Sequence, residues 1–369
     1  MSSKQYHQPY TIISRTITRD KLPSLPPYAR RPTKTMTTAR YTDAEWSDII
    51  SQAQSSILAK LDNDAPPTKI TDLFSVAGAV DHTLLKLDAT AAQIDSLCAE
   101  ARVNNFATVC VRLPFVSRCG ANVSGSGVGI ACVIGFHEGT QDVREKLTEA
   151  KSAVAEGATE LDVVVNVPML IDAKWETIYS ELSALRAVAG KTVLCKLILE
   201  TALLSDSEIV AGSVLASEAG FDFVKTSTGF LTAADLPSGV TATGATLPHV
   251  RLLSLCCASL PQTSESGETR HMRVKASGGI RTLEDAVKML AAGAERLGTS
   301  GGVWIAKEAE QAAHHLVGQA GGNGEVRVEE LRRGSVTEIV RESIGEGTGG
   351  GGGGGGERPG LQTRLFTDY

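Results

Sequence analysis

The sequence predicts an α/β fold, a single (β/α)8 barrel of the TIM type, with an extra helix before the barrel and extensions at both ends. Eight short apolar segments of strand length follow one another, and helix-patterned segments separate most of them. A degenerate repeat supports this interpretation, since AEGATELDVV, SEAGFDFVKT and LAAGAERLGT each run from a helix end through glycine into a strand. The alternative is an open doubly wound sheet. No GxGxxG follows the first strand, however, and eight units in about 235 residues favour a closed barrel.

The first predicted element is a helix ahead of the barrel. The stretch TDAEWSDIISQAQSSILAKL opens with a capping box from Thr42 to Glu45 and continues with apolar residues at helical spacing. The predicted strands then lie within residues 76–85, 106–113, 129–136, 160–167, 192–199, 221–228, 272–277 and 296–300. The predicted barrel helices cover residues 91–103, 142–157, 174–190, 206–220 and 282–294. Four of these helices are followed by a glycine, the residue that most often ends a helix in the left-handed conformation. These glycines are Gly157, Gly190, Gly220 and Gly293.

The two ends of the chain differ from its middle. Residues 1–40 hold eight Lys and Arg, a single acid and five prolines, so we expect this basic segment not to fold alone. A mitochondrial presequence is an alternative interpretation, although the prolines interrupt the amphipathic helix that such a signal needs. We expect the barrel with its leading helix over residues 41–305, a helical segment over 306–345, and a flexible tail over 346–369 with a run of glycines.

Composition and charge narrow the classes of function. Of the 369 residues 42% are hydrophobic, and the mean hydropathy is −0.01, as in ordinary globular proteins. No apolar run approaches the roughly 18 residues of a transmembrane helix, so we expect no membrane partner. The formal net charge of −6 gives no electrostatic reason to expect nucleic acid as a partner.

The seven cysteines indicate a reducing compartment. They are odd in number and show no CxxC or Cys/His ligand spacing, so we expect neither a disulfide framework nor a zinc site. Most of them lie in apolar segments, where cysteine usually serves as a small core residue. We therefore expect a cytoplasmic protein without a bound metal.

Two lysines in apolar strands are the first candidates for chemistry. Lys225 in FDFVKTSTGF and Lys275 in RVKASGGIRT stand at the ends of predicted strands, although lysine is almost never buried without a partner or a use. Active sites of this fold form at the carboxyl ends of the strands, and successive strands are neighbours about 4.8 Å apart. Two ammonium groups this close disfavour each other's charge, so at least one should be a free amine near neutral pH. The residues alone do not indicate which one.

A neutral lysine amine attacks carbonyl carbons and forms a Schiff base, which helps to make or break an adjacent carbon–carbon bond. The reaction also needs a proton shuttle. Asp162, on a strand rich in Leu and Val, is the natural carboxylate for that role. The alternative is a structural ion pair between Asp162 and one lysine, but all three residues at one rim of the barrel favour chemistry.

The placement of glycines suggests where a substrate phosphate binds. SGGIRT and GTSGG offer backbone N–H groups after the last two predicted strands, where barrels commonly bind phosphate. We therefore assign phosphate binding to Gly278, Gly279, Ser300 and Gly301. Other polar residues at strand ends are further candidates for the site: Asp81, Thr83, Asn166, Glu200, Thr201, Thr226, Ser227 and Ser277.

Taken together, these motifs resemble one enzyme family. DHTLLK, ATVCV, ELDVVVNV, KLILET, FVKTSTGF, VKASGGIRT and RLGTSGG, in this order, look like deoxyribose-phosphate aldolase, a class I aldolase family with the barrel fold. The resemblance implies reversible cleavage of 2-deoxy-D-ribose 5-phosphate into acetaldehyde and D-glyceraldehyde 3-phosphate, without metal or organic cofactor. It implies that Lys225 forms the Schiff base, Lys275 depresses the pKa of Lys225, and Asp162 relays protons. It also suggests a homodimer and a place in deoxyribose phosphate catabolism.

Some features depart from the family's pattern. The connection from Gly229 to Arg273 is long, and Phe230 follows TSTG where some relatives carry a basic residue, so substrate preference is open. We expect His137 and Glu138 of GFHEG in a solvated loop, and Lys196 of LCKLILE paired with a neighbouring acid.

Two other functions remain open from the sequence. One is a Schiff-base aldolase for another phosphorylated sugar or a keto acid, which product analysis would distinguish. The other is a non-catalytic protein that binds a phosphorylated metabolite, which predicts binding without turnover. The intact pair of lysines and the aspartate count against this second alternative.

Overall fold

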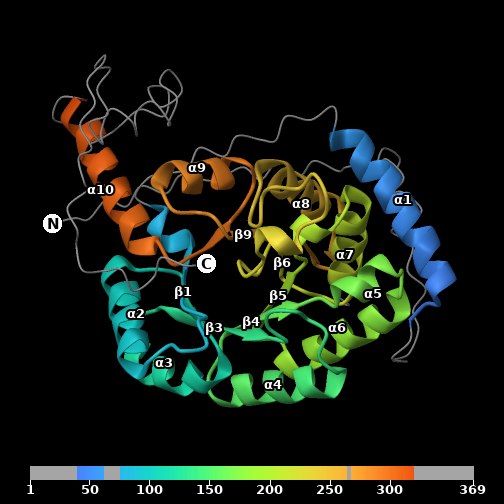
Figure 1. Ribbon diagram of the computed structural model, residues 1–369, viewed down its shortest axis with the longest axis horizontal. Helices are drawn as coiled ribbons and strands as arrows, with labels where there is room; N and C mark the ends of the chain where they lie inside the picture. The colour runs from blue at the N-terminus through green and yellow to red at the C-terminus, as the bar shows by residue number, and fades with distance from the viewer. Residues whose placement is uncertain (1–39, 62–74, 264–266, 320–369) are drawn as a thin grey trace, which may run out of the picture. The chain divides into compact units, whose positions relative to one another are not determined.

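A closed barrel of eight parallel strands forms the body of the chain (Figure 1). The computed structural model describes residues 40–61, 75–263 and 267–319, with side chains up to residue 313. The order around the barrel is β1-β10-β9-β6-β5-β4-β3-β2. The strands are β1 (Val80–Thr83), β2 (Thr108–Val111), β3 (Gly129–Ile134), β4 (Glu160–Val164), β5 (Leu194–Ile198), β6 (Phe223–Lys225), β9 (Arg273–Ser277) and β10 (Arg296–Thr299). Each predicted strand segment contains one of them, so the predicted barrel is confirmed and the open sheet is excluded.

Helices surround the barrel between successive strands (Figure 1). Those that match the predicted ranges are α2 (Ala91–Asn104), α4 (Val143–Ala155), α6 (Trp175–Ala189), α7 (Asp206–Glu218) and α9 (Leu283–Ala291). Those that the sequence did not reveal are α3 (Val116–Val123), α5 (Val167–Ile171) and α8 (Leu247–Ser259). Helices α3 and α5 are too short to show a helical period. The four glycines predicted to stop helices all have positive φ, as expected.

The leading helix α1 (Asp43–Leu61) packs outside the barrel against α6, α7 and α8. Its capping box forms as predicted. The Thr42 N–H donates to the Glu45 carboxylate at 2.9 Å, and the Glu45 N–H donates to the Thr42 hydroxyl at 3.4 Å. Trp46 is fully buried, with its ring 4.9 Å from that of Tyr179 on α6. Burial of this large apolar side chain stabilises the contact between α1 and the barrel.

Helix α10 (Gly302–Gln319) follows the last strand. It overlaps the start of the predicted helical segment 306–345. The rest of that segment, the basic segment up to residue 39 and the tail 346–369 lie outside the described residues. Among the described helices, none combines the length and the hydropathy needed to cross a membrane.

The strand register places charged side chains in the barrel interior. Asp162 on β4 is in register with Lys196 on β5. Lys225 on β6 is in register with Lys275 on β9, which is in turn in register with Arg296 on β10. Because alternate residues of a strand face the same side, these positions form layers inside the barrel.

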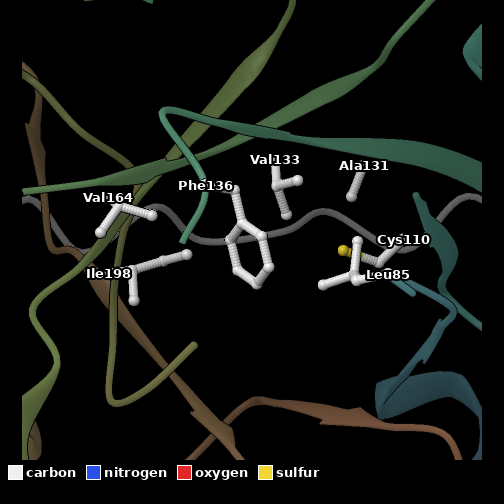
Figure 2. Close-up of a cluster of buried hydrophobic side chains, with 7 residues drawn as sticks. All are labelled: Leu85, Cys110, Ala131, Val133, Phe136, Val164 and Ile198. Carbon is white, nitrogen blue, oxygen red and sulfur yellow. The ribbon is translucent and has the colours of Figure 1, made fainter. Parts of the chain in front are cut away.

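An apolar cluster fills the neighbouring part of the interior, and Figure 2 shows its side chains around Phe136. The cluster comprises Leu85, Cys110, Ala131, Val133, Phe136, Val164 and Ile198. Ile198 is in register with Lys225, and Phe230 packs against the cluster from the connection after β6. Apolar neighbours keep the local dielectric low, so the charges beside them act strongly on one another.

The described residues of the long connection from β6 to β9 contain regular structure. They include a 3-10 turn at Ala233–Asp235, helix α8, and a hairpin of β7 (Gln262–Thr263) with β8 (Thr269–Arg270). Before α8 the chain passes over the loop after β9, where the Ala245 N–H donates to the Ser277 carbonyl at 3.0 Å. The connection therefore supports one wall of the site described next.

Candidate active site

A cavity of about 300 Å³ opens at the carboxyl ends of the strands. Its lining comprises Thr83, Leu85, Glu100, Lys225, Thr228, Ser277, Gly278, Gly279, Ile280, Arg281, Gly298, Thr299, Ser300, Gly301, Val303, Trp304 and Lys307. The structure thus brings together Lys225 and the predicted residues Thr83, Gly278, Gly279, Ser300 and Gly301. This end of the barrel is where enzymes of the fold carry their active sites.

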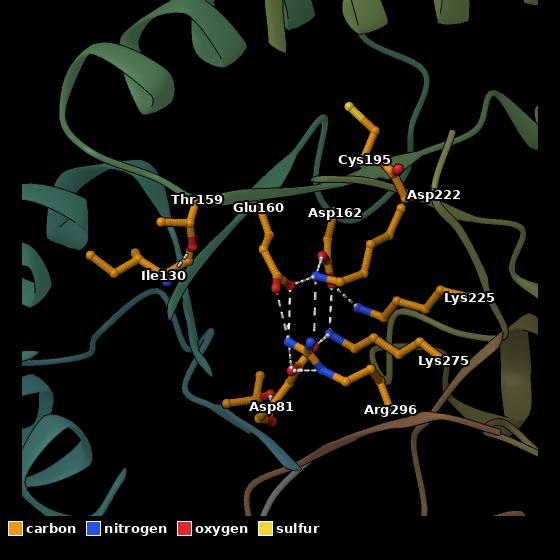
Figure 3. A network of polar contacts seen from close by, with 12 residues as sticks. Asp81, Ile130, Thr159, Glu160, Asp162, Cys195, Asp222, Lys225, Lys275 and Arg296 are labelled. Atoms are coloured by element: carbon orange, nitrogen blue, oxygen red, sulfur yellow. Dashed lines mark hydrogen bonds and ion pairs between the residues drawn. The ribbon is translucent and has the colours of Figure 1, made fainter. Parts of the chain in front are cut away.

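Asp162 lies at the centre of a buried group of lysines (Figure 3). Its Oδ2 accepts from Nζ of Lys225 at 3.1 Å and from Nζ of Lys275 at 2.7 Å. Its Oδ1 accepts from Nζ of Lys196 at 2.5 Å. Asp162 lies in the middle of β4, and the long lysine side chains reach it from β5, β6 and β9. The predicted trio is therefore in contact, although Asp162 lies inside the barrel and not at its rim as expected. Lys196 pairs with an acid as the sequence indicated.

A further set of ion pairs adjoins this group. Asp81 on β1 places Oδ2 2.5 Å from Nζ of Lys275 and Oδ1 2.5 Å from Nη2 of Arg296. Glu160 on β4 pairs with the same Nη2 at 3.0 Å and also with Lys196. Asp81 is thus an ion-pair partner inside the barrel and does not line the cavity. Each of these acids faces cations, and among the described residues no group of three or more His, Cys, Asp or Glu side chains could hold a metal ion.

Thr226 is engaged with the barrel framework. Its hydroxyl donates to the Ser277 carbonyl at 3.1 Å and accepts from the Ser277 N–H at 3.0 Å. Like Asp81, it does not line the cavity. Its position favours a role in joining β6 to β9 next to the glycine pair. The N–H of Gly301, one of the predicted phosphate donors, is likewise engaged, since it donates to the Thr299 hydroxyl at 2.9 Å.

The loop after Lys225 is held by a buried carboxylate. Glu200 has φ of 57°, in the left-handed region, and its Oε2 accepts from the N–H of Thr228 at 3.0 Å and from the Thr228 hydroxyl. Burial raises the pKa of Glu200, although its hydrogen bonds to Thr228 oppose the shift. Since Thr228 lines the cavity, Glu200 fixes part of the wall beside Lys225.

The surroundings of the two predicted lysines differ. Burial and the neighbouring ammonium of Lys275 lower the pKa of Lys225, while Asp162 opposes the shift. Burial acts on Lys275 in the same direction, but Asp162 and Asp81 outweigh it and raise the pKa of Lys275. For Asp162, Lys196 and the other two lysines outweigh burial and hold its pKa well below the usual range. Lys225 is therefore the favoured free amine and Lys275 the favoured ammonium.

Several charged members of the site were not predicted from the sequence. Glu160 stands two residues before Asp162 and so faces the same side of β4, which is a signal that could have been used. Arg296 lies at the start of the last strand. Only closure of the barrel, in which β10 pairs with β1, brings it next to Asp81. Arg281 and Lys307 add two cations to the cavity wall, and Nζ of Lys307 lies 5.1 Å from the Trp304 ring.

An aromatic group surrounds Phe230. The Phe136 ring meets the Phe230 ring edge to face at a centroid distance of 5.0 Å. The centroid of the His137 ring lies 5.2 Å from that of the Phe230 ring. The guanidinium of Arg112 lies 5.0 Å from the Phe136 ring. The side chains of His137 and Glu138 are 40% and 59% exposed, which agrees with the expected solvated loop.

Gly244→Ala should weaken substrate binding. A Cβ at this position would lie 2.5 Å from the Gly278 carbonyl carbon and 3.0 Å from its Cα, so the loop of Gly278 and Gly279 must move. Overpacking of this kind costs about 1–3 kcal/mol. We expect a raised KM, measured by steady-state kinetics. Gly78→Ala is the matched control, because nothing lies within 4 Å of a Cβ there, and equal effects of the two changes would contradict the prediction.

Comparison with known proteins gives a consistent result. The family described as DeoC/LacD family aldolase matches residues 75–325. A deoxyribose-phosphate aldolase of Coccidioides immitis is 46% identical over 264 residues, which are 72% of this chain and 91% of that protein. A Mesoplasma florum protein named deoxyribose-phosphate aldolase 1 is 42% identical over 236 residues, 64% of this chain and 97% of its own length.

Solved structures extend the similarity to three dimensions. A crystal structure of a candidate deoxyribose-phosphate aldolase from Coccidioides immitis superposes with a TM-score of 0.66 at 44% identity, and covers 74% of this chain and 99% of the other. The tetrameric deoxyribose phosphate aldolase of Aeropyrum pernix gives a TM-score of 0.56 at 29% identity, over 72% and 97% of the two chains. With the barrel, the cavity and these matches in agreement, the chain belongs to the DeoC/LacD aldolase family.

Proposed function

We propose that this chain is a deoxyribose-phosphate aldolase that cleaves 2-deoxy-D-ribose 5-phosphate reversibly into acetaldehyde and D-glyceraldehyde 3-phosphate. The observation that carries the proposal is a lysine with a lowered pKa that opens into a cavity with glycine loops on its wall. The names of the similar proteins supply the substrate class. We place the reaction in deoxyribose phosphate catabolism. Neither the cleavage nor its reverse needs a metal or an organic cofactor.

In the proposed mechanism, the free amine of Lys225 adds to the aldehyde carbon of the open-chain sugar, one proton is taken up and water leaves, which gives a protonated Schiff base. This cation accepts electrons as the C2–C3 bond breaks, while the C3 hydroxyl gives up its proton and becomes the aldehyde of glyceraldehyde 3-phosphate. The enamine left on Lys225 takes a proton at C2, and water then releases acetaldehyde, restores the free amine and returns the proton taken up in the first step. The Asp162 carboxylate lies within hydrogen-bond distance of both Lys225 and Lys275, and Lys275 is linked to Lys225 through Asp162, so these two residues can move the protons.

Lys307→Ala should impair binding of the phosphate. We assign the phosphate to the wall that Gly278, Gly279 and Ser300 form, where Lys307 supplies a positive charge. Loss of one charge-assisted contact should raise KM for the phosphorylated sugar about tenfold. The unphosphorylated sugar should be used with unchanged efficiency. Lys288→Ala removes an exposed lysine of α9 that pairs with Glu284, and serves as the control; a loss that is equal for both sugars would contradict the assignment.

Two measurements test the proposed function itself. The first detects acetaldehyde and glyceraldehyde 3-phosphate after incubation with 2-deoxy-D-ribose 5-phosphate, and compares the rate with a panel of other phosphorylated sugars and keto acids. A faster reaction with another member of the panel would favour a different Schiff-base aldolase. The second is borohydride reduction in the presence of acetaldehyde, followed by peptide mass mapping. Binding of the sugar without turnover and without an adduct would favour the non-catalytic alternative.

The assembly and location of the chain are further proposals. A homodimer is our expectation, whereas the Aeropyrum pernix relative is described as tetrameric, so light scattering on the purified protein decides between them. We also propose a cytoplasmic location. The seven cysteines are all buried free thiols, which suits a reducing compartment, and fractionation of cells would test it.

A further inference from the structure

The charges inside the barrel are nearly balanced. Among the described residues, three carboxylates, three cations and Lys225 form one connected network in this space (Figure 3). The carboxylates are Asp81, Glu160 and Asp162, and the cations are Lys196, Lys275 and Arg296. Arg296 is 13% exposed in its side chain and the others are more deeply buried. If Lys225 is neutral the charges cancel, and if Lys225 is protonated one positive charge has no matching carboxylate.

Two chains of ion pairs connect the far end of this network to Lys225. One runs from Arg296 through Asp81 and Lys275 to Asp162, with successive distances of 2.5, 2.5 and 2.7 Å. The other runs from Glu160 through Lys196 to Asp162, where the Lys196 contact is 2.5 Å. Both chains end at the Asp162 carboxylate, which accepts from Lys225 at 3.1 Å.

Glu160 and Arg296 are separate from the cavity. Neither lines it, and none of the contacts described for these two side chains involves Lys225. They bind each other through Nη2 of Arg296, at 3.1 and 3.0 Å from the two Glu160 oxygens. The Phe223 ring lies 5.9 Å from the Arg296 guanidinium and 4.0 Å from the guanidinium of part-exposed Arg273. A direct role in binding the sugar is therefore excluded for this pair by its position.

We propose that Glu160 and Arg296 act as positioning residues that fix the charge balance of the barrel interior and thereby make Lys225 the one free amine among the three lysines. The inference rests on the proposed Schiff-base function of Lys225. A buried charge without a partner is unfavourable, so the network favours the protonation state in which its charges cancel. Lys196 and Lys275 each pair with two or more carboxylates, whereas Lys225 pairs with one carboxylate among the described residues, that of Asp162. Loss of a proton therefore costs the least free energy at Lys225.

Other titratable groups also face Lys225 and must be kept constant in a test. From the interior they are Asp162 and Lys275, with the Cys110 thiol on β2 and the Glu200 carboxyl after β5. From the cavity wall they are Glu100, Arg281 and Lys307. Glu160 and Arg296 can be changed without altering any of these side chains.

The test uses two substitutions of similar size and opposite charge effect. Arg296→Met removes a positive charge, so Lys225 should hold its proton to higher pH. Glu160→Gln removes a negative charge, so Lys225 should lose its proton at lower pH. The double variant removes one charge of each sign and should restore the behaviour of the unaltered chain. Arg296→Lys keeps the positive charge but loses the planar guanidinium group. It should leave the pH dependence of Lys225 modification unchanged even if the stability of the fold decreases.

The readout is the pH at which acetaldehyde and borohydride modify Lys225 to half the maximal extent, as measured by peptide mass mapping. We expect a shift of about half a pH unit or more, upward for Arg296→Met and downward for Glu160→Gln. Circular dichroism shows which variants are folded. If Arg296→Met does not fold, Glu160→Gln and the double variant still report one direction of shift and its reversal.

The outcomes separate this inference from the proposed function. If Lys225 is not modified at any pH in the unaltered chain, the Schiff-base function fails and the inference fails with it. If Lys225 is modified but the two substitutions leave the midpoint unchanged, or move it in the same direction, the inference alone is overturned. Asp95→Asn and Arg118→Met disrupt an exposed pair with side chains 43% and 45% exposed, and should not move the midpoint.

Discussion

Lys225→Ala is expected to reduce kcat by about four orders of magnitude or more, because the covalent intermediate cannot form without the amine. Lys225 opens into the cavity, is 2% exposed, and has the lowered pKa that a nucleophilic lysine needs at neutral pH. The adduct with acetaldehyde should disappear from the mapped peptides in the same variant. Steady-state kinetics and mass mapping measure the two effects.

A matched control separates loss of the nucleophile from loss of a buried lysine. Lys146 on α4 is also fully buried, but its Nζ donates to Glu181 and to the Val164 carbonyl outside the cavity. Lys146→Met should destabilise the fold yet leave the acetaldehyde adduct on Lys225. Survival of substantial aldolase activity in Lys225→Ala, with the adduct on another lysine, would show that the nucleophile lies elsewhere.

Asp162→Asn is expected to cost about 3–5 kcal/mol of unfolding free energy at neutral pH, because it leaves buried ammonium groups without their shared carboxylate. Three lysines contact this one side chain, and all of them are buried. Urea unfolding measures the loss. The exposed Asp95→Asn variant should leave the unfolding free energy nearly unchanged, since surface ion pairs contribute little.

The pH dependence of stability gives a second measure of Asp162. Its pKa is lowered in the folded state, so its stabilising contribution is present above the unfolded value of about 3.9 and is lost as the pH falls through the folded value. The difference in stability between the unaltered chain and Asp162→Asn should therefore persist at neutral pH and shrink in strong acid. A difference that does not change with pH would contradict an ionised Asp162.

The same variant distinguishes structure from chemistry at this position. If Asp162 were only an ion-pair partner, activity should follow the folded fraction. If it also relays protons, kcat should fall well below that fraction, by about 10²–10⁴-fold. Because Oδ2 accepts from both Lys225 and Lys275, we expect the larger loss.

Local patterns in the sequence were sufficient for the barrel. The eight apolar segments, the capping box from Thr42 to Glu45 and the glycine stops at positive φ all appear where they were predicted. These features depend on neighbours within a few residues, so they can be recognised without a structure. Helix α8 was missed because it lies within a long connection whose direction is set by contacts such as that of Gly244 with Gly278.

The sequence by itself also determined which residues to examine, since Lys225, Lys275 and Asp162 stand out as charged residues in apolar strands. The residues alone did not determine which lysine is the free amine, and the resemblance to a family supplied that assignment. Only the tertiary structure showed that Asp81 and Asp162 both pair with Lys275, while Lys225 pairs with Asp162 alone among the described residues. A pKa depends on every charge within several ångströms, and here those charges come from β1, β4, β5, β9 and β10. Barrel closure, not sequence proximity, brings them together.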